Sequence, residues 1–466
     1  MCKIKTRFNS AFTTAFWIWL VVTILVASSV GMIYQRLGMA GFEVFLRTGP
    51  HSILSVTMVS VTLTWLLVGI YLYLFGSGRL GANNVFKHTG FLLVAFMYLN
   101  VMRERNRYGD IDYYIKAAKS LLRDQPLPTT YFYPPLWATI LKYLVVYGDD
   151  FILAFAWTLN ILALFAFYFL LQRVLEKYGF APRMATLTTM AFILVNTTIL
   201  RTLGYMQVNL HMLNFILLGL LLFRRSNFWS ALCMALAVYL KASPAVLVLA
   251  FFLELDWRWM AWAAFHMLWL TALLLWLDGT RPFLDFFHNY ALLTSPHTSV
   301  YHDNSFDSFL LAIAEFTNLP LQLAMYMANA AKVIVGIIVF LGIPRVIKNK
   351  TFHSGDDNPR LYNSLPLLAI LMILATPLIW EHHGIILTLP FLLMLKRLDT
   401  PSEWSWFGFA YLLQYIVPTF DFFPWSYGHL LAPLILLWLV FRSDKESSHF
   451  ARWNQWLENI SLSQIR

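Results

Sequence analysis

The chain has 466 residues, of which 59% are hydrophobic and only 12% are charged. An ordinary soluble domain has roughly half apolar and about a quarter charged residues, so this composition excludes a soluble globular protein. The formal net charge of +10 is not concentrated in basic runs interleaved with aromatic residues, which argues against a nucleic-acid partner. The two cysteines, Cys2 and Cys233, provide neither a disulfide framework nor a cysteine metal site.

Apolar runs of membrane-spanning length recur along the chain, and short polar breaks separate them. The first run lacks a convincing cleavage site, so we interpret it as an anchor rather than a removed signal peptide. These features predict an all-α polytopic membrane protein with a bundle of about 12–14 transmembrane helices. The expected spans are residues 11–33, 52–75, 88–103, 151–172, 184–203, 207–223, 228–240, 244–255, 258–277, 321–343, 362–379, 384–396, 405–421 and 425–441.

The basic residues in the loops predict the orientation of the chain, because Lys and Arg favour the cytoplasmic side. Both termini are then cytoplasmic, provided that segment 131–147 lies along the membrane or dips into it. Residues 1–445 form the membrane domain and 446–466 a cytoplasmic tail. The expected outer loops are 34–51, 104–150 and 278–320, and the last two are long enough to carry function.

Three arginines near the start of the second outer loop break the orientation rule locally, since they fall on the outer side. They are Arg103, Arg105 and Arg107. Such a cluster indicates either an error in topology or an anion site, and we favour the anion site.

Two carboxylates, Asp110 and Asp112, follow these arginines. A carboxylate here can act as a general base, and a pair can hold a divalent metal, although a solvated acidic loop has the same pattern. Residues 113–122 then predict an amphipathic helix in the plane of the interface. Segment 131–135, Tyr-Phe-Tyr-Pro-Pro, has tyrosines that suit the headgroup layer.

Two further polar groups interrupt the apolar runs. Gln207 and Asn209, at the outer end of a hairpin, can bind sugar hydroxyls or phosphate, or can join two helices by hydrogen bonds. Lys241 lies between two apolar runs, where a charge is costly unless it faces a cavity, an interface or a phosphate. A lysine that extends its ammonium group toward the interface is the alternative.

A histidine pair follows a Thr-Pro break late in the chain. His382 and His383, next to Glu381, can bind a phosphate or protonate a leaving oxygen. Metal ligation by this pair is conceivable, but adjacent histidines lack the spacing of a helical zinc pair. The late outer loop, with Asn304 and Ser305, could cap a substrate cavity.

Taken in order, these elements resemble the GT-C superfamily of membrane glycosyltransferases, and most closely glycosyltransferase family 87. That family comprises polyprenyl-phosphate-mannose-dependent mannosyltransferases. The resemblance covers roughly residues 90–400, and residues 1–88 form additional N-terminal spans. The matching residues are Asp110, Tyr113, Tyr114, Ala117, Ala118, the 131–135 segment, Trp157, Asn160, Gly204, Gln207, Asn209, Lys241, Pro244, Asn304 or Ser305, Pro377, Trp380, His382 and His383.

The resemblance implies an inverting single displacement. The superfamily includes metal-dependent and metal-independent members, and we favour a reaction without a divalent metal because an Asp-x-Asp pair alone is a weak metal site. Asp110 would deprotonate an acceptor hydroxyl, with Asp112 as a rival base or metal ligand. The leaving polyprenyl phosphate needs positive charge and hydrogen bonds more than a strong acid. The residues expected at the donor are His382, His383, Lys241, Arg103, Arg105, Gln207, Asn209, Tyr114, Tyr133, Asn304 and Glu381.

The implied partners are a polyprenyl-phosphate sugar, a lipid or glycan acceptor and membrane lipids, in cell-envelope glycolipid synthesis. The implied location is a bacterial plasma membrane with the active site outside. A transporter or flippase of lipid-linked sugars is the main alternative, although no two similar halves are evident in the sequence. A lipid-linked polymerase or ligase would place its essential residues in a late outer loop, and a structural scaffold would not explain the polar residues.

Overall fold

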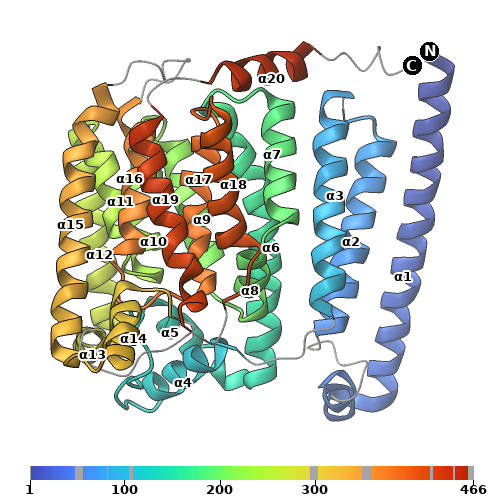
Figure 1. Cartoon of the computed structure of the whole chain (residues 1–466). Coiled ribbons are helices and arrows are strands. Elements are labelled where there is room, and N and C mark those ends of the chain that lie inside the picture. Colours follow the sequence, from blue (N-terminus) through green and yellow to red (C-terminus); the bar gives the residue numbers. More distant parts are fainter. Residues whose placement is uncertain are drawn as a thin grey trace. The chain divides into compact units, whose positions relative to one another are not determined.

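The computed structural model describes residues 2–47, 56–80, 82–103, 109–293, 303–348, 359–419, 423–443 and 447–459. The described part of the chain is built from helices and contains no strand (Figure 1). The predicted all-α architecture is therefore confirmed. The helices form two compact units, of which the second is much the larger and contains residues 109–143 and 163–466.

The first unit comprises residues 1–108 and 144–162. Its elements are α1 (Cys2–Arg47), α2 (Val56–Gly76), α3 (Ala82–Arg103), η1 (Val145–Tyr147) and the start of α6 (Asp149–Lys177). α1 is interrupted at Gly38, whose φ of +66° suits glycine, and it packs against α2. The indole nitrogen of Trp19 donates a 3.1 Å hydrogen bond to the Trp65 carbonyl. Many large apolar side chains of α1 are exposed, as expected for a helix that faces lipid.

The second unit contains the end of α6 and the remaining helices. These are α4 (Ile111–Leu122), α5 (Leu136–Lys142), α7 (Pro182–Leu194), α8 (Thr197–Gly204), α9 (Asn209–Leu222), α10 (Asn227–Leu240), α11 (Ala245–Phe252), α12 (Trp257–Asp278), α13 (Arg281–Leu293), α14 (Phe306–Thr317), α15 (Leu321–Lys348), α16 (Pro359–Leu374), η3 (Glu381–Leu387), α17 (Thr388–Met394), α18 (Pro401–Tyr415), η4 (Trp425–Tyr427), α19 (Gly428–Arg442) and α20 (Ser448–Asn459).

The core of the second unit is formed around α16. Residues 361–374 of this helix are all buried, and the helix contacts α11, α15 and α19. Such a helix is apolar on every side because no face of it meets water. α9 and α10 approach closely at Gly219, whose carbonyl accepts a 2.7 Å hydrogen bond from the Ser230 hydroxyl. Small residues and interhelical hydrogen bonds are typical of helix packing in membranes.

Five of the described helices are long and apolar enough to cross a membrane: α1, α2, α6, α12 and α15. α7 and α8 qualify only as a pair, bent by 61°. The predicted span 184–203 is thus broken, because the Asn196 side chain caps α8 by accepting a 3.0 Å hydrogen bond from the Ile199 amide. α9, α10, α16 and α19 are apolar but shorter. The count of about 12–14 spans stays a prediction.

Four helices gather at one end of the second unit: α4, α5, α13 and α14 (Figure 1). α4 contains the predicted amphipathic segment, and Tyr114, Ala117 and Ala118 are on its buried side. α13 and α14 lie in the predicted late outer loop, for which no helix was predicted. α13 is attached to the segment between α4 and α5, since the Asn289 amide donates to the Tyr131 carbonyl at 3.1 Å.

A buried ion pair joins α5 to the end of α12. The Lys142 ammonium pairs with the Asp278 carboxylate, and the side chains are 13% and 4% exposed. The Thr139 hydroxyl donates a 2.5 Å hydrogen bond to the same carboxylate. A buried charge whose partner is lost becomes strongly unfavourable, so this contact fixes the short helices at this end of the unit.

We predict that Asp278→Asn lowers the stability by about 3–5 kcal/mol, because it leaves the Lys142 charge without a counter-ion. Thermal unfolding in detergent, followed by tryptophan fluorescence, measures the change. The control Asp150→Asn alters an exposed carboxylate and should change stability by less than about 0.5 kcal/mol. The double variant Lys142→Met with Asp278→Leu should recover most of the loss. Equal stability of Asp278→Asn and the control would contradict a structural role for this pair.

Candidate functional site

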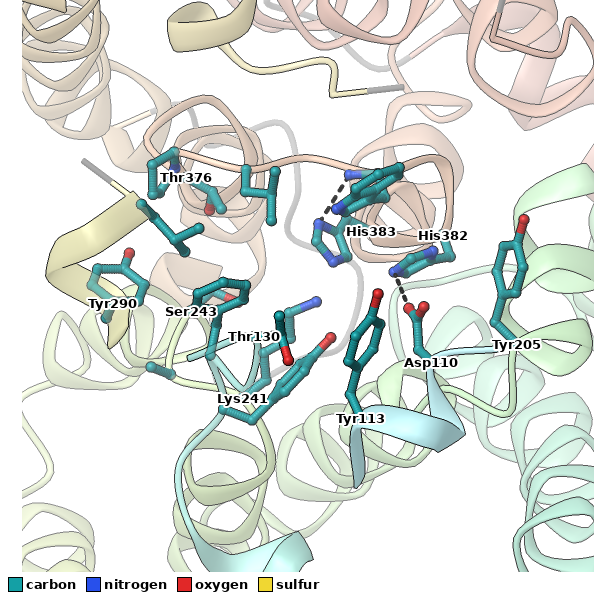
Figure 2. Close-up of a pocket in the computed structure, with 17 residues that line it drawn as sticks. Asp110, Tyr113, Thr130, Tyr205, Lys241, Ser243, Tyr290, Thr376, His382 and His383 are labelled. Atoms are coloured by element: carbon teal, nitrogen blue, oxygen red, sulfur yellow. Dashed lines mark hydrogen bonds and ion pairs between the residues drawn. The ribbon is translucent and has the colours of Figure 1, made fainter. Parts of the chain in front are cut away.

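A cavity of about 340 Å³ lies at the same end of the second unit as α4 and α13. Segments distant in the sequence meet around it: the start of α4, the loop before α5, the turns after α8 and α10, the end of α13, and the segment before η3 (Figure 2). Its lining residues are Asp110, Tyr113, Thr130, Phe132, Tyr133, Tyr205, Lys241, Ala242, Ser243, Tyr290, Leu293, Thr376, Pro377, Leu378, Trp380, His382 and His383.

Asp110 is at the N-terminus of α4, and its carboxylate is 27% exposed. Its Oδ2 accepts a hydrogen bond from the Gln207 side-chain amide and lies 3.7 Å from Nε2 of His382. Burial raises the pKa of Asp110, although the Gln207 hydrogen bond and the positive charge of Lys241 oppose the rise. The carboxylate is therefore a stronger proton acceptor than an ordinary aspartate.

The turn between α8 and α9 brings Gln207 to Asp110. The backbone N–H of Gln207 donates to the Thr202 carbonyl at 2.9 Å, and the backbone N–H of Met206 donates to the Leu203 carbonyl at 3.1 Å. With Met206 at φ +54°, this is a Schellman helix end without its usual glycine. The backbone of Tyr205 then approaches Gly109 so closely that a Cβ there would lie 2.7 Å from the Tyr205 Cα.

A cluster of buried tyrosines supports Gln207 from the other side. The Tyr114 hydroxyl donates a 2.6 Å hydrogen bond to Oε1 of Gln207, which fixes the amide with its NH₂ group toward Asp110. The rings of Tyr114, Tyr131 and Tyr133 pack edge to face with centroids 5.1–6.2 Å apart. Such packing makes the position of the amide rigid.

Lys241 follows the end of α10, and its ammonium group points into the cavity (Figure 2). Nζ donates a 3.0 Å hydrogen bond to Oδ1 of Asn209 and lies 5.8 Å from the centre of the Tyr133 ring. Burial lowers the pKa of Lys241 to about 7, although the negative charge of Asp110 opposes the fall. The Asn209 amide in turn donates a 3.2 Å hydrogen bond to the His382 carbonyl.

The histidine pair lies in the 3₁₀ turn η3. The Trp380 amide donates to Nδ1 of His383 at 3.2 Å, so the proton of a neutral His383 is on Nε2. Burial lowers the pKa of both His382 and His383 well below the usual range, and the charge of Lys241 lowers both further. Burial and the Lys241 charge thus disfavour the charged form of both rings in the empty cavity, while a hydrogen bond with the Leu378 backbone opposes the shift at His383.

Glu381 does not line the cavity. Its carboxylate pairs with Nε of Arg201 at 2.9 Å and accepts a 2.6 Å hydrogen bond from the Thr419 amide. Two charge-assisted contacts thus fix the start of η3 against α8 and against the segment that follows α18. Arg201 was not singled out in the sequence. The available signal was a basic residue at an outer helix end, four positions before Tyr205.

The late loop is attached to the same segment by Asp303 and Asn304. Asp303 is fully buried, and its carboxylate accepts hydrogen bonds from the Ile379 amide at 2.7 Å and from Ser305. The backbone N–H of Asn304 donates to the Ile379 carbonyl at 2.7 Å. Asn304 therefore fixes the backbone before the histidine pair, and it is not among the lining residues.

The predicted site residues fall into three groups. Those that line the cavity are Asp110, Tyr133, Lys241, His382 and His383. Those outside the lining are Asp112, Tyr114, Gln207, Asn209, Asn304 and Glu381, and all of these except Asp112 bond to the site or to the segment that carries the histidines. Arg105, Arg107 and the side chain of Arg103 lie outside the described residues.

The profile of glycosyltransferase family 87 matches residues 131–377, which is more than half of the chain. The chain belongs to glycosyltransferase family 87. None of the curated proteins that were compared matches it. Together with its apolar helices, this membership makes the protein an integral membrane glycosyltransferase. The cavity lies partly before the matched region, since Asp110 precedes residue 131.

The two aspartates near α4 are the candidate metal ligands from the sequence. Within the described ranges, no three His, Cys, Asp or Glu side chains form a group that could hold a metal ion. Asp112 is in the first turn of α4 and does not line the cavity with Asp110. Metal independence stays a prediction that an assay with a chelator tests.

We predict that Gly109→Ala lowers transferase activity at least tenfold and destabilises the protein by about 1–3 kcal/mol. The new methyl group would meet backbone atoms of Tyr205, so the start of α4 and Asp110 must move. The matched control is Gly408→Ala in α18, where nothing lies within 4 Å. Sugar transfer to a lipid extract and thermal unfolding measure the two effects. Normal activity of Gly109→Ala would show that the position of Asp110 is not critical.

Proposed function

We propose that the protein transfers a sugar, mannose in the first instance, from a polyprenyl phosphate to an acceptor hydroxyl on the outer face of the membrane. The observation that carries this proposal is the joint presence of Asp110, Lys241 and the histidine pair in one cavity. A proton acceptor and an anion-binding group within one cavity are the two requirements for displacing a sugar from a phosphate.

Asp110 acts as the general base. Its carboxylate removes the proton of the acceptor hydroxyl while that oxygen attacks the anomeric carbon from the side opposite the phosphate. The bond between the anomeric carbon and the phosphate oxygen breaks, its electron pair goes to the phosphate, and the configuration inverts. A raised pKa suits this role, since a base is most effective when its pKa is close to the working pH.

Lys241, His382 and His383 stabilise the leaving group. The phosphate of the donor carries one negative charge and the released polyprenyl phosphate carries two at alkaline pH. Groups that interact more strongly with the second charge lower the barrier to reaction. A phosphate beside Lys241 offsets the burial of the ammonium group and keeps it charged, and the neutral imidazoles add hydrogen bonds.

The prenyl chain of the donor requires an apolar surface beside the phosphate. Leu293, Leu378 and Phe132 supply such a surface in the lining. Figure 2 shows Tyr290 and Thr376 on the side of the cavity away from Asp110. This arrangement suits a donor whose lipid extends past α13 while its sugar lies toward Asp110.

Charged residues at the other end of the second unit support an outer location for the cavity. Lys177 and Arg183 flank the α6–α7 connection, Lys396 follows α17, and Arg442 ends α19. α20, which follows α19, lies at the end opposite α4 and α13 (Figure 1). The positive-inside rule assigns this basic end of the second unit, with α20, to the cytoplasm of a bacterial cell and the cavity to the outside.

Asp110→Asn should abolish transfer by purified protein from radiolabelled polyprenyl-phosphate-mannose to a crude lipid extract, with a loss of about 10³-fold or more. Asp112→Asn is the matched control, because it removes a carboxylate from the same turn, outside the cavity; it should retain most activity. Thermal unfolding establishes that both variants are folded.

Undiminished transfer by Asp110→Asn would refute its role as base, and loss in Asp112→Asn alone would move the role to Asp112. Absence of transfer by the wild type would direct the assay to other polyprenyl-phosphate sugars, and failure of all of them would favour a transporter.

EDTA should leave transfer by the wild type unchanged. Inhibition by EDTA that added Mg²⁺ or Mn²⁺ reverses would overturn metal independence.

The value of kcat/KM for the donor should decrease as the pH rises above about 7. Lys241 has a lowered pKa of about 7, so the empty enzyme loses this positive charge as the pH rises through that value. The Lys241→Arg variant keeps its positive charge, because a guanidinium group stays protonated throughout the working pH range. The decrease of kcat/KM at alkaline pH should therefore disappear in this variant.

The control for this comparison is Lys348→Arg, an exposed substitution at the end of α15. It should leave the profile unchanged. An alkaline decrease that persists unaltered in a folded, active Lys241→Arg variant would exclude Lys241 as the group responsible.

A further inference from the structure

Two tyrosines flank the proposed base. Tyr113 and Tyr205 both line the cavity, and Figure 2 shows the Asp110 carboxylate between their rings. They come from different elements, α4 and the end of α8. Lys241 and Ser243 belong to another part of the lining, after α10. The surroundings of Asp110 are therefore aromatic on two sides.

Tyr113 is presented to the cavity rather than to the core. Its side chain is 39% exposed, whereas its neighbour Tyr114 is fully buried in the tyrosine cluster. Lys116 follows Tyr113 by three residues on α4, and its Nζ lies 6.0 Å from the centre of the Tyr113 ring. An exposed ring this close to a general base offers apolar surface that a bound molecule can cover.

Tyr205 is held in place by several independent contacts. Arg201 donates a 3.2 Å hydrogen bond from Nη1 to the Tyr205 hydroxyl, while its Nε pairs with Glu381. The close approach of Gly109 fixes the Tyr205 backbone, and the ring meets His382 edge to face at 6.0 Å. The orientation of the ring is thus set before any substrate binds, which reduces the cost of binding.

The chemistry of the base identifies what these rings contact. A general base must reach the hydroxyl that it deprotonates, so the acceptor molecule lies next to Asp110 and between the two rings. The C–H groups of a sugar ring carry partial positive charge and pack favourably against the negative face of an aromatic ring. A flat sugar ring with hydroxyls at its edge fits such a clamp, and a simple alkyl alcohol does not use it.

We propose that Tyr113 and Tyr205 form the acceptor subsite and that they bind a sugar ring, so that the acceptor is a glycoside. Arg201 and Glu381 are positioning residues, since they orient Tyr205 without contacting the reacting atoms. This inference rests on the proposed glycosyl transfer with Asp110 as base. It adds the class of the acceptor and the residues that recognise it.

The first test separates the binding of the two substrates. Tyr113→Leu and Tyr205→Leu should raise the apparent KM for a titrated lipid extract at least tenfold and change the KM for polyprenyl-phosphate-mannose less than twofold. Tyr113→Phe keeps the ring and should raise the KM for the extract less than threefold, whereas Tyr205→Phe also loses the hydrogen bond from Arg201 and should raise it about as much as Arg201→Gln does. Arg201→Gln should raise the same constant with little change in the donor KM, as expected of a positioning residue.

Two controls bracket these variants. Tyr290→Leu, on the side of the cavity away from Asp110, should raise the donor KM and leave the extract KM unchanged. Tyr326→Leu removes a ring that is 63% exposed on α15 and lies outside the cavity, and it should change neither constant. Thermal unfolding is measured for every variant, and the Phe variants decide the matter if a Leu variant does not fold.

The second test addresses the acceptor itself. Mild periodate cleaves the vicinal diols of sugar rings, and borohydride then removes the resulting aldehydes. An extract treated in this way should lose at least nine-tenths of its acceptor capacity, while a mock-treated extract keeps it.

The possible failures are distinguishable. If wild-type protein transfers no sugar from any polyprenyl phosphate, the proposed function fails and the acceptor subsite fails with it. If transfer occurs but the Leu variants raise the donor KM as much as the extract KM, the tyrosines are not an acceptor subsite. Full capacity of the periodate-treated extract would overturn the assignment of a sugar ring while leaving the glycosyl transfer intact.

Discussion

The site depends on two amide side chains that hydrogen-bond to partly buried charges. Gln207 donates to the Asp110 carboxylate, and Asn209 accepts from the Lys241 ammonium group, two residues further along the same turn. A charge removed from water is tolerated only when hydrogen bonds replace its hydration. The turn between α8 and α9 therefore determines where both charged groups can exist, and the histidine segment is added through the bond from Asn209 to the His382 carbonyl.

This dependence explains why so much of the surrounding structure is rigid. Met206, in the left-handed conformation, ends α8 so that the Gln207 side chain points toward Asp110. Gly109 allows α4 to approach that turn. The tyrosine cluster holds the amide from behind, and the Asp303 carboxylate holds the backbone that precedes the histidines. Each contact provides a hydrogen-bond partner for a polar group that would otherwise be unpaired, and together the contacts fix the arrangement of the cavity.

Much of this site could be predicted from the sequence, because polar residues are costly in a membrane protein and each one is informative. Asp110, Lys241, His382 and His383 stood out among apolar residues, and they do line one cavity. The roles of Gln207 and Asn209 could not be assigned, since an amide that supports a charged group and one that binds a ligand have the same sequence pattern. Their burial and their partners make the difference.

Other features were beyond the sequence for different physical reasons. α13 buries Pro282, Phe286 and the polar Asn289, whereas Leu284 and Phe287 are exposed, so the buried face of this helix is not the one that hydrophobicity alone would indicate. The bend between α7 and α8 depends on how Asn196 uses its side chain, which apolar run length does not reveal. Arg201 lies near the end of a predicted span, and its importance comes from Glu381, 180 residues away.

The lowered pKa of Lys241 makes the protonation state of the enzyme differ between its empty and loaded forms. If the substrate is the proposed phosphate donor, its binding favours the charged form of Lys241, and proton uptake from the medium would accompany binding near neutral pH. With the cavity on the proposed outer face of the membrane, that medium would be the one outside the cell. The occupancy of the cavity would then respond to the acidity of the cell's surroundings, although the reaction itself neither consumes nor transports a proton across the bilayer.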